Sequence, residues 1–209
     1  MASFFKVVFM SFMQIHNVIL YIMIAITLIA LFIVIERGIF FTLILKEGNK
    51  LQDYLHKHIK DPSLYGELLE VFSGSKSPQS KALCDVVRVA QTHPSHEKME
   101  YMVQSIYVAQ KPDVTSRLWI LDTIITLSPL LGLLGTIMGI IDAFTSLSSG
   151  NVAADPAAVS RGIGTALYAT GFGIFIALFA LLFYNLFNNI VEKITNQMKF
   201  ISLSILGVE

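Results

Sequence analysis

The sequence has few charged residues and a single cysteine. Aspartate, glutamate, lysine and arginine make up only 14% of the 209 residues, whereas hydrophobic residues make up 54%. This balance excludes an ordinary soluble domain and indicates an integral membrane protein. Cys84 is the one cysteine, so no intramolecular disulfide can form. The formal net charge is zero, so the composition gives no argument for binding nucleic acid.

The sequence also lacks the motifs of enzyme catalysis. It contains no nucleophile beside a base, no paired carboxylates at catalytic spacing and no phosphate-binding loop. We therefore expect no enzyme activity, no cofactor and no metal. Four histidines, His56, His58, His93 and His96, fall in the central region. A metal site there is one alternative, but the spacing is irregular and favours solvated side chains.

Three apolar segments, residues 16–36, 118–147 and 162–187, reach the roughly 20 residues that a transmembrane helix needs. The first is bulky and free of glycine, which suits contact with membrane lipid. It is too long for a cleaved signal peptide and no small-residue cleavage site follows it. Residues 1–15 are rich in phenylalanine. They predict either an amphipathic helix lying in the membrane interface or an extension of the first span.

Lysine and arginine predict the orientation. Eleven of the fifteen basic residues lie between Arg37 and Arg117, and none lies between Ser146 and Ser160. Because positive residues stay inside, we place the region 37–117 and the tail 188–209 in the cytoplasm. The N-terminus and the turn 148–161 are then periplasmic. Apolar spacing predicts several helices in the region 37–117 that extend the transmembrane helices and pack on one another, with Ser73–Ser80 as a linker.

Small residues recur along the second and third apolar segments. In the second, Pro129 is followed by Gly132, Gly135 and Gly139. In the third, steps of three and four residues separate Gly162, Ala166, Ala169, Gly173, Ala177 and Ala180. Lipid gives helices no hydrophobic reason to associate, so such strips indicate two helices whose backbones pack closely.

Polar side chains within the apolar segments are the candidates for function, because they are costly at membrane depth. They are Asp122, Thr136, Asp142, Thr165, Thr170 and Asn185. In an antiparallel hairpin whose outer ends lie near residues 146 and 160, Thr136 and Thr170 fall level with each other. At about 1.5 Å per residue both lie roughly 15 Å inside, near the middle of the hydrocarbon core. Thr165 falls level with Ile141 and Asp142.

The threonines and the two aspartates also have simpler interpretations. A threonine often bonds back to its own helix. Asp122 lies at the inner boundary, where water or Arg117 can pair with it, and Asp142 can reach interfacial water. Two threonines at one depth favour a polar ring formed by several subunits around a pore. With no carboxylate at mid-depth, the chain needs oligomerisation and a partner that brings the acid.

Three parts of the sequence resemble the MotA/TolQ/ExbB family of ion-driven motor proteins, and most closely its ExbB and TolQ branch. They are Glu36-Arg37, RLWILDTIITLSPLLGLLGTIMGIIDAF from Arg117 to Phe144, and GIGTALYATGFGIFIALFALLFYNLF from Gly162 to Phe187. The resemblance implies an all-α membrane protein with three transmembrane helices and a large helical cytoplasmic loop, in a pentameric bundle of the bacterial inner membrane. The four-span plan of MotA, a stator for motility, fits less well.

The resemblance further implies that the pentamer encloses single transmembrane helices of an ExbD- or TolR-like partner, whose aspartate carries the ion. The family's pore threonines correspond to Thr136 and Thr170. Ion flow would drive work passed on to a TonB- or TolA-like periplasmic protein. A non-conducting scaffold for a partner helix is the alternative from another class. A small transporter is a third, but it should show inverted repeats or broken helices with a substrate site at the midplane.

One position departs from the family pattern. ExbB and TolQ proteins commonly carry a glutamate five residues before the threonine of the third span, where this chain has Thr165. Either the acidic function has moved to Asp142 on the facing helix, or hydroxyls serve alone. The resemblance implies proton coupling, whereas a site of threonine oxygens alone would allow sodium.

Overall fold

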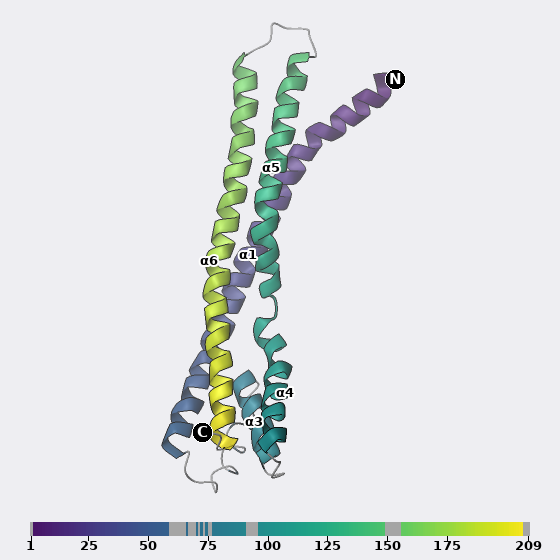
Figure 1. The fold of residues 1–209 in the computed structure, drawn as a ribbon. Coiled ribbons are helices and arrows are strands. Elements are labelled where there is room, and N and C mark those ends of the chain that lie inside the picture. The colour runs from purple at the N-terminus through teal and green to yellow at the C-terminus, as the bar shows by residue number, and fades with distance from the viewer. Residues whose placement is uncertain are drawn as a thin grey trace. The chain divides into compact units, whose positions relative to one another are not determined.

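The computed structural model describes residues 2–58, 66, 70, 72, 74, 77–90, 96–148 and 156–206. These residues are helical except for turns or bends at Gly74, Ser77 and Ser116–Arg117. The helices are α1 (Ala2–His58), α3 (Pro78–Ala90), α4 (His96–Thr115), α5 (Leu118–Ser148) and α6 (Pro156–Leu206) (Figure 1). This described part contains no strand. The all-α fold class expected from the sequence is confirmed.

Three of the helices are long and apolar enough to cross a membrane, judged by length and composition. Their apolar stretches are Val18–Leu55 in α1, Leu118–Thr145 in α5 and Gly162–Ile205 in α6. At about 1.5 Å per residue, helices of 57 residues (α1) and 51 residues (α6) are longer than a hydrocarbon core of roughly 30 Å. Residues 2–15 accordingly continue α1 without a break, and residues 188–206 of the predicted tail continue α6.

The chain divides into two compact units. The first comprises Met1–Val34 and Trp119–Tyr184. Within it α5 and α6 lie side by side as an antiparallel hairpin (Figure 1). One face of α1 is buried at Ile19, Met23 and Ala30, whereas Leu28 and Phe32 are exposed. Exposed apolar side chains of this kind would promote aggregation in water, but they suit contact with the hydrocarbon of a bilayer.

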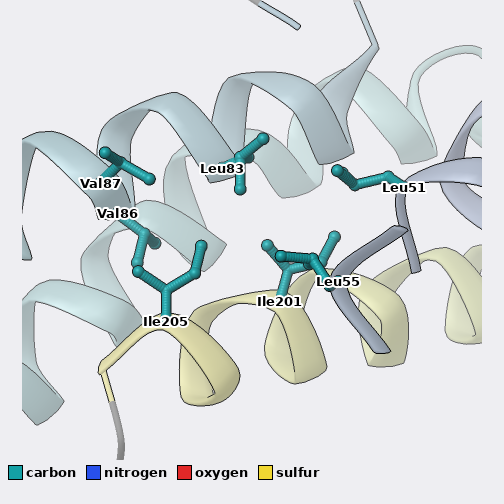
Figure 2. Packing of buried hydrophobic residues seen from close by; sticks show 7 residues of the cluster. All are labelled: Leu51, Leu55, Leu83, Val86, Val87, Ile201 and Ile205. Carbon is teal, nitrogen blue, oxygen red and sulfur yellow. The ribbon is translucent and has the colours of Figure 1, made fainter. Parts of the chain in front are cut away.

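The second unit comprises Ile35–Leu118 and Asn185–Glu209. Figure 2 shows its apolar core, in which the side chains of three helices meet. The members are Leu51 and Leu55 of α1, Leu83, Val86 and Val87 of α3, and Ile201 and Ile205 of α6. Each fully buried side chain of this kind contributes about 1.5–3 kcal/mol. The helices predicted for the region 37–117 therefore pack together through a hydrophobic core where they are described.

Helix α3 begins earlier than the sequence pattern predicted. The segment Ser73–Ser80 is expected to be a linker, yet residues 78–80 already belong to α3. The hydroxyl of Ser77 accepts a hydrogen bond from the backbone N–H of Ser80 at 3.2 Å and so caps the helix. Pro78 stands at the first helical position, where proline's fixed φ is favourable. The Ser-Pro pair is thus a helix start rather than a linker. Within the region 37–117, in which several helices are predicted, residues 59–76 fall largely outside the described residues.

A buried polar layer lies beside the core of the second unit. The amide nitrogen of Gln79 donates to Oε1 of Gln197 at 3.3 Å, and the amide nitrogen of Gln197 donates to Oδ1 of Asn49 at 2.8 Å. Gln79 and Gln197 are both buried. Gly48 leaves the room for them, because a Cβ there would lie 2.5 Å from Oε1 of Gln197. Side-chain amides therefore connect α1, α3 and α6.

Candidate ion pathway in the first unit

Helices α5 and α6 approach closely along the small residues that the sequence pattern singled out. A Cβ added to Gly132 would lie 2.9 Å from the Cα of Thr170, and one added to Gly173 would lie 2.5 Å from the carbonyl oxygen of Ser128. Real Cβ atoms do not come so close to backbone, so only glycine fits at these two positions. We call this contact the α5/α6 seam. Pro129 lies inside α5 next to it.

The remaining contacts of the seam fix which residues face each other. Gly139 lies against Ala166, with an added Cβ only 2.8 Å from the Cβ of the alanine. Gly135 faces Ala169 in the same way at 3.0 Å, and Gly162 faces Ala143 at 3.1 Å. The contact at Gly135 also comes within 3.8 Å of Ile19 of α1.

Thr136 and Thr170 lie at the same level of the hairpin, because Gly135 faces Ala169. Their hydroxyl groups point to different partners. Thr170 donates across the seam to the carbonyl oxygen of Gly132 at 2.9 Å. Thr136 donates within its own helix to the carbonyl oxygen of Leu133 at 2.7 Å. Both hydroxyls keep lone pairs that can accept a hydrogen bond or coordinate a cation.

Thr165 and Asp142 lie nearer the closed end of the hairpin. Both fall between the contacts Gly139–Ala166 and Ala143–Gly162. Thr165 is exposed and its hydroxyl donates to the carbonyl oxygen of Gly162 at 2.9 Å, whereas Asp142 is half-buried. The structure thus places the hydroxyl and the carboxylate within about one turn of each other along the hairpin.

A groove of about 650 Å³ opens beside the hairpin, between α1 and α6. Its walls are mostly apolar, and Thr165 and Tyr168 bring side-chain hydroxyls to it. Tyr168 is 80% exposed. Tyr168 is not among the residues predicted from the sequence, although its aromatic hydroxyl lies two residues from the mid-depth Thr170. Ser128, which is buried in the seam, is likewise not among the predicted residues.

Charged residues form a separate cluster in the second unit. Glu36 pairs with Nε of Arg37 and with Nη1 of Arg117, each at 3.0 Å. Arg37 is buried, and its guanidinium lies 4.6 Å from the centre of the Phe40 ring, a cation–π distance. Arg117 has a φ of 66°, a left-handed conformation, at the turn between α4 and α5. No group of metal-binding side chains occurs among the residues whose positions are described.

Comparison with known families decides the assignment. The model of the MotA/TolQ/ExbB proton channel family matches residues 74–199, which include α5 and most of α6. The chain belongs to this family.

Relatives within the family refine the assignment to a branch. A biopolymer transport protein named ExbB-like 3 from Synechocystis sp. is 31% identical over 78% of this chain and 77% of its own length. A second Synechocystis protein, named ExbB-like 1, is 29% identical over 88% of this chain and 71% of its own. The Tol-Pal system protein TolQ of Haemophilus influenzae is 29% identical over 81% and 77%. These relatives place the chain in the ExbB/TolQ branch, a transport-type family of membrane proteins.

Proposed function

We propose that this ExbB/TolQ family member is the stator subunit of an ion-driven motor, which couples ion flow to mechanical work on a periplasmic partner. The observation that carries the proposal is the level pair of threonines, Thr136 and Thr170, at the closely packed α5/α6 seam. Their hydroxyl oxygens can accept hydrogen bonds from water or coordinate a cation without a charge of their own. The expected ion is the proton, with sodium as the alternative.

The partner supplies the carboxylate. Between Asp122 and Asp142 α5 carries no acidic residue, and α6 carries none before Glu192. A proton relay needs a group that takes up and releases the proton, so a single-span ExbD- or TolR-like protein with a membrane aspartate fits this gap. A TonB- or TolA-like protein then receives the work in the periplasm.

A homopentamer in the bacterial inner membrane is the assembly that we propose. The hydroxyls of Thr165 and Tyr168 line a groove open to the surroundings of one chain. Hydrocarbon offers these groups no hydrogen-bond partner, so a surface that carries them suits contact with protein or a water-filled path. The exposed outer face of α1, with Leu28 and Phe32, suits lipid. The N-terminus is periplasmic and the C-terminus cytoplasmic in this arrangement.

A second candidate function is a scaffold that holds a partner helix without conducting ions. Two observations favour it. Thr165 stands where the family commonly has a glutamate, and the hydroxyls of Thr136 and Thr170 already donate to backbone carbonyls. A MotA-like role in motility is the remaining alternative within the family.

The decisive experiment replaces the two threonines. Thr136→Val or Thr170→Val should abolish ion-driven work in cells, because a hydroxyl is lost at nearly constant volume. Thr136→Ser and Thr170→Ser are the matched controls, since they keep the hydroxyl and should keep most activity. Co-purification of the single-span partner checks that each variant still assembles. Full activity of both valine variants in assembled complexes would leave the scaffold as the better explanation.

The displaced acid has its own test. If Asp142 replaces the glutamate, Asp142→Asn should impair ion-driven work strongly, and Thr165→Glu should partly restore it by returning a carboxylate nearby. Activity measured without sodium at a fixed proton gradient identifies the ion. Loss of activity on sodium removal would assign sodium, and unchanged activity would assign the proton.

A further inference from the structure

Ser128 carries a buried hydroxyl in the α5/α6 seam that has no hydrogen-bond partner among the described residues. The residue is 1% exposed, and its Oγ has no hydrogen bond to any group in the described part of the chain. A polar group left unpaired in an apolar interior destabilises the folded state, and more strongly so in a membrane, where water offers no alternative partner. Such a group in a native structure requires an explanation, and a bound water is a common one.

The described threonine hydroxyls of α5 behave differently. Thr123 donates to the carbonyl oxygen of Trp119, Thr126 to that of Thr123, and Thr136 to that of Leu133. Each thus satisfies its donor by bonding back three or four residues along its own helix. Ser128 does not, although a suitable acceptor lies one turn away.

That acceptor is the carbonyl of Ile125. In a regular helix it would receive the N–H of residue 129, but Pro129 has no N–H to give. A donor and an acceptor without their usual partners therefore lie one turn apart on α5. One turn further along, the carbonyl of Gly132 accepts the hydroxyl of Thr170. Polar groups thus continue from Thr170 toward the Leu118 end of α5.

We propose that Ser128 holds an ordered water molecule in the seam. The hydroxyl of Ser128 donates to the water oxygen, and the water donates to the carbonyl of Ile125. This role rests on the proposed function. Ser128 is a positioning residue in it, because the water that it holds extends the ion path inward from Thr136 and Thr170. Ser128 acts through this water and is not itself the ion carrier.

The test compares Ser128→Ala with Thr126→Val. Thr126 lies two residues from Ser128, and its exposed hydroxyl bonds back to its own helix. Two readouts are measured in complexes purified with their partner: ion flux in proteoliposomes and the thermal unfolding midpoint. We expect Ser128→Ala to lower flux several-fold without raising the midpoint, and Thr126→Val to leave flux unchanged. A dry, unpaired hydroxyl would give the opposite result, a higher midpoint with normal flux, and would overturn the proposal.

A third readout does not depend on activity. Magnetisation transfer from water to the Ser128 hydroxyl, measured by solid-state NMR of the wild-type protein in lipid bilayers, should reveal a water molecule in contact with it. Absence of that transfer would overturn the inference even if the threonine variants behave as a motor predicts. If the wild-type complex conducts no ion, the proposed function fails, while the NMR contact still decides whether Ser128 holds water.

Discussion

At the scale of single residues, the contact between α5 and α6 depends on glycine having no Cβ atom. The space beside Gly173 is closed by the backbone of Ser128, whereas Gly171, two residues earlier on the same helix, has nothing within 4 Å of an added Cβ. Helix propensity is the same for both positions, so they differ only in what a methyl group would meet. The pair therefore separates packing from propensity.

We predict that Gly173→Ala lowers the stability of the protein and that Gly171→Ala does not. The methyl group at 173 forces the helices apart, and such overpacking costs about 1–3 kcal/mol. The same change at 171 meets open space and gains the better helix propensity of alanine, about 1 kcal/mol in favourable cases. Thermal unfolding in detergent, followed by circular dichroism, measures both. Equal midpoints for the two variants would contradict the close packing at Gly173.

Cys84 in α3 gives a prediction about pH. Burial raises the pKa of its thiol above the ordinary value, nearby Arg88 opposes the shift, and Asp85 adds to it. Because the thiolate is the reactive form, alkylation by iodoacetamide should reach half its maximal rate at a higher pH than in the denatured protein. The unfolded chain releases this proton first, so the thiol's contribution to stability is lost as pH rises above the ordinary cysteine value. Coincident rate profiles for folded and denatured protein would refute the shift.

At the scale of helices, the sequence predicted which helices exist and that they pack together better than it predicted where each helix begins and ends. Apolar length alone defined α1, α5 and α6, because a membrane leaves few alternatives to a long helix. The start of α3 was missed because serine and proline signal both a linker and a helix cap, and only the capping bond to Ser80 distinguishes them. Ser128 and Tyr168 were missed because periodicity does not tell whether a hydroxyl finds a partner, which depends on the neighbouring helix.

The turn between α4 and α5 supplies the prediction at this scale. Arg117 adopts a left-handed φ, which costs a residue with a side chain roughly 1 kcal/mol more than glycine. Arg117→Gly and Arg117→Ala both lose the ion pair with Glu36, but only alanine keeps the strain. Arg117→Gly should therefore unfold at a higher temperature than Arg117→Ala. The reverse order would show that the turn does not need a left-handed residue.

At the scale of the whole molecule, the distribution of lysine and arginine predicts which side of the membrane each part occupies. Cysteines introduced at Ser149 or Asn151, which lie outside the described residues, should react with a membrane-impermeant maleimide added to intact spheroplasts. The native Cys84 should react only after the membrane is permeabilised so that the reagent reaches the cytoplasmic face. The same is expected of a cysteine at the exposed position Lys50 in a Cys84→Ser background. Labelling at Lys50→Cys from the periplasmic face would overturn the orientation.

The buried amides of the second unit have a consequence for how the last helix is aligned during folding. Gln79 bonds to Gln197, and a slip of α6 by one turn would bring Lys193 or Ile201 to that place instead. Neither residue offers an oxygen to the amide of Gln79, so the slipped arrangement buries an unpaired donor at a cost of about 1–3 kcal/mol. The apolar core beside it would tolerate such a slip more easily, since one aliphatic side chain can replace another. The hydrogen bond between Gln79 and Gln197 therefore favours one register of α6 over those shifted by a turn.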